Sequence, residues 1–264
     1  MEKIAARDPV ATAADLKEIV ELGALDGELY SRTFFPKTFR QPNAPFHRDM
    51  WQLLDSTHRQ INMQVFRDGA KTTICRAYTS KRIAYGLARN ILYIGKSEAH
   101  ALRSIAWLRR QVEFNKVWAQ TFGLRKGSRW TDEESEIIHE VEGASCWILG
   151  MGITGSVRGI NRDDYRPDLI VLDDIVDEEN AATVDQRNKI NNLIYGAVAR
   201  SLAPASENPD AKIVALQTPL NKEDYSTLAT RDPEWVSRVY SCWTRETQDA
   251  RPQAQESSWP ARRP

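Results

Sequence analysis

The sequence predicts an α/β fold with a mostly parallel sheet and helices on both faces, and two observations lead there. First, four short apolar runs lack the alternation of a half-exposed strand, and strands buried on both faces read in this way. These runs are residues 61–66, 90–95, 168–172 and 211–216. Second, helix-compatible segments separate the runs, which is typical of a parallel sheet. The longest are residues 72–88, 97–114 and 179–202.

The remaining elements can be predicted from local signals. We expect an amphipathic helix over residues 12–22, with Thr12 as its N-cap. The stretch 34–45 contains three prolines and reads as an irregular connector. The other predicted elements are a helix over 47–56, an antiparallel hairpin formed by 136–141 and 145–149, and a last strand over 235–243.

Length and composition are those of an ordinary globular protein. The 264 residues allow one large domain with a small appendage, and 41% hydrophobic and 27% charged residues are usual values. Thirty-six basic and 36 acidic residues give zero net charge, so any contact with nucleic acid must come from local patches. Candidate basic residues are Arg103, Arg109, Arg110, Arg125, Lys126 and Arg129, although such residues more often form a solvated helix face.

Cysteine usage and hydropathy argue against two classes of protein. The cysteines Cys75, Cys146 and Cys242 form neither a disulfide framework nor a metal-ligand spacing, which favours a reducing cytosol. The N-terminus has early acidic residues, and no apolar run reaches 18 residues. We therefore expect neither a signal peptide nor a membrane span.

The most informative segment is residues 64–73, which reads Gln-Val-Phe-Arg-Asp-Gly-Ala-Lys-Thr-Thr. A strand, a tight glycine-containing loop, Lys-Thr and then a helix form the arrangement that holds a nucleoside triphosphate. Backbone N–H groups would face phosphate oxygens, Lys71 would add a cation, and the Thr72 hydroxyl would ligate Mg²⁺. The loop is unusual, because Ala70 and Val65 stand where the common pattern has glycines. The predicted ATP-binding residues are Arg67, Asp68, Gly69, Ala70, Lys71, Thr72 and Thr73.

A second constellation is the apolar run 168–172 followed by Asp173 and Asp174. Open α/β sheets bind ligands at the carboxyl ends of their strands, where this run would deliver two carboxylates. One would hold Mg²⁺, and the other would orient or deprotonate the attacking water. Because Asp177 and Glu178 follow closely, the catalytic carboxylate stays ambiguous. An acidic turn after a strand is the alternative, and the preceding Lys-Thr loop favours function.

Two further segments carry candidate residues. Gln217 and Thr218 follow another predicted strand, where they would face the nucleotide and sense the loss of its γ-phosphate. By themselves they would read as an ordinary turn before proline. Residues 155–162 place Arg158 and Arg162 among glycines, and an arginine in such a loop can reach a phosphate in its own subunit or a neighbour's. A solubilising surface loop is the alternative there.

The order of these motifs resembles the ATPase domain of the large terminase subunit of tailed double-stranded DNA bacteriophages. The resemblance runs from about residue 46 to 259, and the ordered set is more specific than any single motif. The motifs are Arg67-Asp-Gly-Ala-Lys71-Thr72, Gly-Ser-Val-Arg158-Gly, Arg166-Pro-Asp-Leu-Ile-Val-Leu-Asp173-Asp174 and Gln217-Thr218-Pro-Leu-Asn-Lys-Glu-Asp224. It implies a RecA-like (ASCE) P-loop NTPase fold, with ATP and Mg²⁺ as cofactors.

The resemblance also implies roles for individual residues. Arg67 would be the family's extra Walker A arginine, which contacts or senses the γ-phosphate, while Lys71 and Thr72 bind phosphate and Mg²⁺. Asp173 would be the Walker B acid that serves the metal. Asp174 stands where many relatives have the catalytic glutamate, so the base is either Asp174 or Glu178. The remaining implied roles are a trans-acting arginine finger for Arg158 or Arg162, a coupling motif for Gln217 and Thr218, and adenine contact for residues 46–52.

At the level of the whole protein, the resemblance implies a motor that hydrolyses ATP to drive viral double-stranded DNA into a procapsid. The expected partners are double-stranded DNA, the portal protein, the small terminase subunit and other copies of the chain in a ring on the capsid. The expected location is the host cytoplasm and, transiently, the procapsid portal, and no membrane is involved. The expected domains are an N-terminal segment (1–45), the ATPase domain (46–243) and a linker (244–264) toward a nuclease domain that is absent here.

Two other functions fit parts of the pattern. A helicase-like nucleic-acid translocase shares the loop, the acidic strand end and a coupling motif, but it normally has a second RecA-like domain. A non-catalytic scaffold with a decayed nucleotide loop would explain the missing glycines. Nucleotide binding without hydrolysis would indicate the scaffold.

Overall fold

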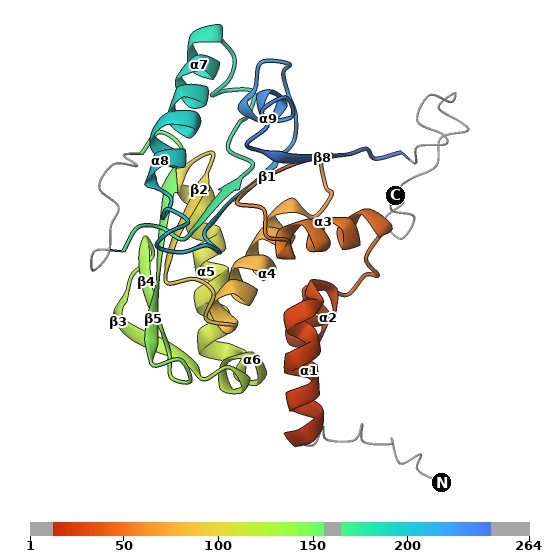
Figure 1. Ribbon diagram of the computed structural model, residues 1–264, viewed down its shortest axis with the longest axis vertical. Helices are drawn as coiled ribbons and strands as arrows, with labels where there is room; N and C mark the ends of the chain where they lie inside the picture. The colour runs from red at the N-terminus through yellow and green to blue at the C-terminus, as the bar shows by residue number, and fades with distance from the viewer. Residues whose placement is uncertain (1–12, 156–164, 244–264) are drawn as a thin grey trace.

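The computed structural model describes residues 13–155 and 165–243, which form one mixed β-sheet with helices on both faces (Figure 1). The strand order in this part of the chain is β3-β4-β5-β2-β6-β7-β1-β8. The strands are β1 (Gln60–Val65), β2 (Asn90–Gly95), β3 (Leu124–Trp130), β4 (Glu134–His139), β5 (Ala144–Gly152), β6 (Leu169–Asp173), β7 (Lys212–Gln217) and β8 (Val236–Tyr240). The predicted α/β class is confirmed.

The sheet has a parallel part and an antiparallel edge. All pairings from β5 through β2, β6, β7 and β1 to β8 are parallel. The predicted hairpin is β4–β5, and its antiparallel pairing is confirmed. Strand β5 continues to Gly152 and pairs in parallel with β2, so the hairpin extends the main sheet. Parallel strands all end at one edge, and that edge carries the predicted site.

Helices cover both faces of the sheet. On one face lie α1 (Ala13–Leu25), α2 (Gly27–Phe34), α3 (Pro45–Asp55), α4 (Lys71–Ala84), α5 (Glu98–Phe114) and α6 (Lys116–Thr121). On the other lie α7 (Val184–Asn192), the π-helix η1 (Leu193–Val198), α8 (Ala199–Ser201) and α9 (Tyr225–Ala229). Strand side chains alternate between the two cores. In β6, Leu169 and Val171 join the first core, and Ile170 and Leu172 join the second.

Several predicted boundaries shift for local reasons. The helix expected over 72–88 ends at Ala84, because Gly86 adopts a left-handed conformation with φ +64°. The helix expected over 179–202 begins only at Val184, after a capping box between Thr183 and Gln186. The elements α2, α6, α9 and β3 were not predicted. Strand β3 is mostly exposed and polar, so it lacks the apolar signal of the inner strands.

The N-terminal helix is confirmed and extends to Leu25, while Thr12 and the tail 244–264 lie outside the described residues. Side chains of α2, such as Tyr30 and Phe34, belong to the same core as α3, α4 and α5. The domain boundary expected near residue 45 stays a prediction. No helix in residues 13–155 or 165–243 has the length and apolar character needed to cross a bilayer.

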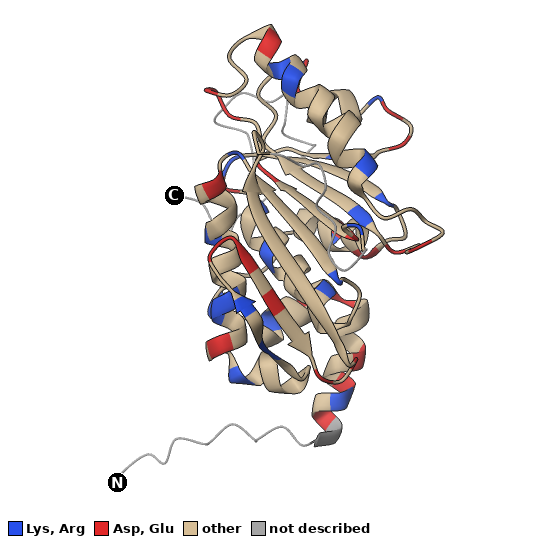
Figure 2. Cartoon of the chain, turned by 90° about the vertical axis from the view of Figure 1, so that its left-hand side faces the viewer, with Lys and Arg blue, Asp and Glu red and all other residues tan. Residues whose placement is uncertain are grey.

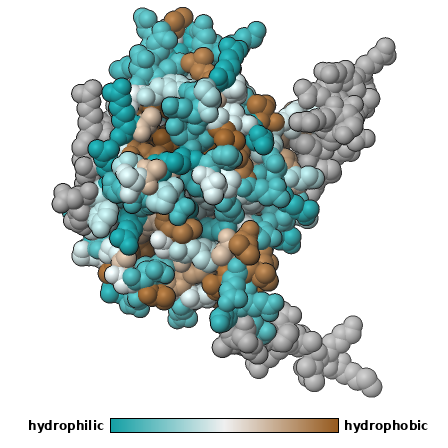
Figure 3. All heavy atoms as spheres, viewed as in Figure 1, coloured by the Kyte–Doolittle hydropathy of each residue, from teal (hydrophilic) through white to brown (hydrophobic). Residues whose placement is uncertain are grey.

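The molecular surface is mixed in character. On the face seen in Figure 1, hydrophobic groups lie in separate spots among hydrophilic ones (Figure 3). Basic and acidic positions are interspersed along the chain, with both kinds on the helices (Figure 2). Three of the candidate basic residues are engaged in ion pairs, which are Arg109–Asp132, Arg125–Glu140 and Arg129–Glu134. Arg103 and Arg110 are exposed on α5 and form no ion pair within the described chain.

Candidate functional site

The loop between β1 and α4 has the tight geometry that a phosphate cradle needs. The Gly69 N–H donates to the Phe66 carbonyl at 3.2 Å, which closes the turn. A Cβ at Gly69 would lie 2.5 Å from Val65 Cγ1, so only glycine fits there. Asp68 and Ala70 both adopt left-handed conformations, with φ of 63° and 62°. Ala70 thus takes a backbone conformation that glycine adopts without strain but that costs alanine about 1 kcal/mol, so the departure from the usual pattern strains the loop.

Lys71 begins helix α4 and directs its ammonium group back into the loop. Its side chain is buried, and Nζ donates to the carbonyl of Phe66 at 3.2 Å and to Thr218 Oγ1 at 2.6 Å. Ala70 is the N-cap residue of α4 and provides no side-chain cap. The first amides of a 14-residue helix therefore face the loop together with the lysine, an arrangement that attracts anions.

Asp173 ends strand β6 and is 0% exposed. Thr72 donates its hydroxyl proton to Asp173 Oδ1 at 3.0 Å, and Tyr93 donates its own to Oδ2 at 2.7 Å. Burial raises the pKa of Asp173, and the hydrogen bond from Tyr93 is the largest effect that opposes the rise. The two residues predicted to serve the metal, Thr72 and Asp173, thus lie in direct contact.

Asp174 lies next to the two residues of the predicted coupling segment. It has a left-handed backbone with φ of 51°, and its Oδ1 accepts from the Thr218 N–H at 2.9 Å and from Gln217 Nε2 at 3.2 Å. Gln217 is fully buried and also bonds the backbone of Val176. This contact exists because β7 lies between β1 and β6 in the sheet, which places residues 217–218 between the loop and the acids.

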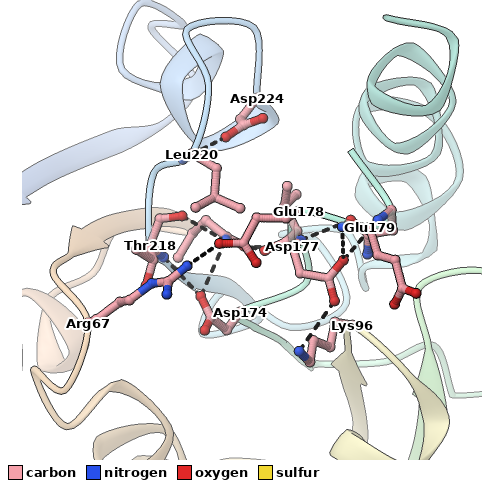
Figure 4. A network of polar contacts seen from close by, with 12 residues as sticks. Arg67, Lys96, Asp174, Asp177, Glu178, Glu179, Thr218, Leu220 and Asp224 are labelled. Carbon is pink, nitrogen blue, oxygen red and sulfur yellow. Dashed lines mark hydrogen bonds and ion pairs between the residues drawn. The ribbon is translucent and has the colours of Figure 1, made fainter. Parts of the chain in front are cut away.

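A second layer of charges surrounds this cluster (Figure 4). Arg67 of the loop forms an ion pair with Glu178, and both side chains are largely exposed. Lys96, which follows β2, lies 3.3 Å from Asp177. Asp177 also accepts the backbone N–H groups of residues 179 and 180, so it shapes the turn after β6. Lys96 and Tyr93 were missed by the sequence reading, because neither stands beside a recognisable motif.

The residues present fit a magnesium ion held largely by water and phosphate. Thr72 and Asp173 supply hard oxygen donors, and the Thr72 hydroxyl keeps its lone pairs while its proton is donated. No group of three or more His, Cys, Asp or Glu within the described ranges could hold a metal alone. Mg²⁺ usually takes only one or two protein ligands at such sites, so the two findings agree.

A cavity of about 320 Å³ opens beside the loop, and none of the predicted acids lines it. Its lining residues are Thr38, Phe39, Arg40, Gln41, Asn43, His47, Ala70, Thr73 and Ile74. Of the segment 46–52, which was expected to contact adenine, only His47 lines this cavity, and the proline-bounded connector supplies most of the rest. Burial lowers the pKa of His47 to about 4, and its Nδ1 accepts the Ala44 N–H at 3.0 Å.

The structure brings together every predicted site residue that it describes. Loop residues 67–73, the acids 173, 174 and 178, and residues 217–218 all lie at the carboxyl edge of the parallel strands. Arg158 and Arg162 lie outside the described residues, so their role as arginine fingers stays a prediction.

Comparisons with known proteins support the same fold. No protein-family model matches the sequence, and no curated protein matches it. The large terminase ATPase domain of Thermus phage P74-26 aligns with a TM-score of 0.53 and 13% identity, over 79% of this chain and 85% of that one. A mutant form of that domain aligns with the same TM-score at 11% identity. The large terminase of a thermophilic bacteriophage in complex with ADP covers 84% of this chain and 44% of that one, but its TM-score of 0.43 at 14% identity is too low to support an argument.

At such low identities, the similarity establishes the fold. The chain has the RecA-like α/β fold of phage large terminase ATPase domains. The resemblance seen in the order of the motifs is thereby confirmed at the level of architecture.

Proposed function

We propose that this chain is the ATPase domain of a viral DNA-packaging motor, which hydrolyses ATP to drive double-stranded DNA into a procapsid. One observation carries the proposal. Lys71 contacts Thr218, Thr72 contacts Asp173, and Asp174 accepts the Thr218 N–H, so a phosphate cradle, a metal-holding pair and a coupling segment share one small site. The architecture shared with terminase ATPase domains supports a motor over other ATPases.

The loop and helix α4 would bind the phosphates of ATP. Their amides face the same space as Lys71, whose ammonium would exchange its contact with Thr218 for a phosphate oxygen. Thr72 and Asp173 would hold Mg²⁺, which would neutralise charge on the β- and γ-phosphates. The adjoining cavity of about 320 Å³ would take the base, with Phe39 and Ile74 as apolar contacts.

Glu178 is the better candidate for the residue that activates water. One carboxylate oxygen of Asp174 already accepts two donors from residues 217–218, which suits a sensor that reports on the nucleotide. Glu178 is exposed and paired with Arg67, the loop arginine expected near the γ-phosphate. A phosphate that attracts Arg67 would release this carboxylate to accept a proton from water.

The coupling segment would transmit the state of the nucleotide through Lys71. With phosphate present, the lysine leaves Thr218, and after phosphate release it returns. Thr218 would move together with Asp174, which accepts its backbone N–H. Gln217, its neighbour in the chain, would follow, because it also donates to Asp174. The DNA, portal, small-subunit and ring contacts of the motor belong to the same proposal, as does its action in the host cytoplasm.

Calorimetry with a slowly hydrolysed ATP analogue and Mg²⁺ tests the site before any question about DNA arises. We expect binding to the native chain, and loss of binding and turnover in Lys71→Ala. Lys116→Ala, on the exposed surface of α6, is the control and should behave like the native chain. Undiminished ATPase activity in Lys71→Ala would reject the site assignment.

Further outcomes separate the candidate functions. Turnover per chain that rises with protein concentration supports a ring in which neighbours complete each site. Binding with no hydrolysis at any concentration indicates a scaffold. Strand separation of duplex DNA by a longer chain indicates a helicase.

A further inference from the structure

The carboxylate of Asp173 is held from a side that no nucleotide would reach. Thr72, on the loop side, donates to Oδ1. Tyr93, on the neighbouring strand β2, donates to Oδ2 at 2.7 Å and is itself 0% exposed. A carboxylate whose two oxygens each accept a hydrogen bond from a different element cannot rotate freely, so its plane is set before any ligand arrives.

A second buried hydroxyl lies near Tyr93. Ser104 of helix α5 is 0% exposed, and burial raises the pKa of Tyr93 while this serine opposes the rise. The Ser104 oxygen accepts from Arg76 Nε at 3.1 Å, and Arg76 lies one helical turn after Thr72 on α4.

Two side-chain contacts tie the elements of the site together. Tyr93 on β2 donates to Asp173 at the end of the paired strand β6, and Arg76 Nε of α4 donates to Ser104 of α5.

We propose that Tyr93 is the positioning residue of the metal site, and that its hydroxyl sets the orientation of the Asp173 carboxylate. The inference rests on the proposed function, in which Asp173 serves Mg²⁺. Second-layer groups of this kind typically change metal affinity by about 10- to 100-fold when they are removed. Tyr93 touches neither nucleotide nor water in this scheme, so its effect should appear in the magnesium dependence and not in the binding of the base or phosphates.

Tyr93→Phe removes the hydroxyl and keeps the ring that fills the core. We expect ADP affinity in EDTA to match the native chain, and the Mg²⁺ concentration that half-maximally tightens ADP binding to rise about tenfold or more, measured by calorimetry. Half-saturation of ATPase by Mg²⁺ should shift equally, and excess Mg²⁺ should restore turnover.

Tyr30→Phe is the matched control. Tyr30 is 0% exposed and hydrogen bonded to a serine, Ser80, but lies away from Asp173. We expect it to lower stability without changing the Mg²⁺ dependence. Magnesium half-saturation within twofold of native in Tyr93→Phe would overturn the positioning role while leaving the ATPase assignment intact. A native chain that binds no nucleotide would reject the proposed function, and the role of Tyr93 with it.

Discussion

The two ends of strand β6 carry the same residue type in different settings. Asp168 precedes the strand and Asp173 ends it, and both are buried, with 5% and 0% of their surface exposed. Burial raises the pKa of each. Asp168 accepts backbone N–H groups, from Arg89 at 2.8 Å and Asn90 at 3.1 Å. Asp173 instead accepts only side-chain hydroxyls in the described chain.

The difference in donors separates a structural aspartate from a functional one. A backbone N–H can only donate, and its direction is fixed by the main chain, so a buried one needs an acceptor at a fixed position. A hydroxyl can rotate, can reverse its role and keeps lone pairs for a ligand. Backbone conformation supports the same distinction. The non-glycine residues with positive φ in the described chain are Asp68, Ala70 and Asp174, and all three lie at the edge of the sheet where Asp173 ends β6. Strained backbone of this kind gathers at functional sites.

Exchanging each aspartate for asparagine tests this comparison and should give the largest effects. We expect Asp173→Asn to lower ATP turnover on the order of 10²-fold. Its unfolding free energy should stay within about 1 kcal/mol of native, because the hydroxyl partners can accept from the new amide. Asp168→Asn should lose about 1–3 kcal/mol of stability, since an NH₂ group would face a backbone N–H. Urea unfolding and ATPase assays on both variants check this. Equal losses of stability and equal losses of turnover in the two variants would refute the distinction between a structural and a functional aspartate.

Acid titration should reveal the buried histidine beside the loop. The pKa of His47, beside the loop, is lowered to about 4, and that of Lys212, at the opposite edge, to about 8, both by burial. Below pH 7 Lys212 is protonated in both folded and unfolded chains. His47 binds its proton more weakly when folded, so the stability it contributes is present above pH 6.5 and is lost as pH falls toward 4.

We expect the unfolding free energy to fall by about 2 kcal/mol between pH 7 and pH 5 from His47. His47→Gln should remove most of this dependence when urea unfolding is repeated at each pH. Burial also lowers the pKa of His100, so this residue should account for part of the pH dependence that remains. An equally steep fall in His47→Gln would show that another group controls acid stability.

Ala70→Gly tests the strain at the loop. Left-handed backbone costs a residue with a Cβ about 1 kcal/mol, so the variant should unfold with a free energy higher by roughly that amount. Ala77→Gly, in the buried interior of the same helix, should instead lower stability by about 1 kcal/mol or more. Thermal melts of the two variants should therefore move in opposite directions, and a lowered melting temperature in Ala70→Gly would argue against strain.

The smallest effect is expected for the exposed ion pair between Arg67 and Glu178. The two side chains are 70% and 76% exposed, and such pairs contribute at most about 1 kcal/mol. Glu178→Gln should leave stability nearly unchanged while reducing turnover, if this carboxylate activates water. Asp174→Asn provides the comparison, and unfolding together with single-turnover ATPase would show which acid the reaction needs.

Much of the fold could be predicted because its signals are local. Apolar runs without alternation marked β1, β2, β6 and β7, and the Lys-Thr loop, the paired acids and Gln217 each follow one of these strands. In a parallel sheet the strand ends meet at one edge, so the shared site followed from the motifs. Strand β3 and helices α2, α6 and α9 were missed, since short or exposed elements carry little periodic signal.

The sequence by itself determined the α/β class, the loop chemistry and the edge on which the acids lie, because periodicity and turn chemistry are properties of neighbouring residues. Only the tertiary structure decided that β7 lies between β1 and β6, which joins Thr218 to both Lys71 and Asp174. It also brought Tyr93 to Asp173, 80 positions apart in the chain. Such pairings depend on how crossovers order the strands, and that order is set by packing of the whole sheet.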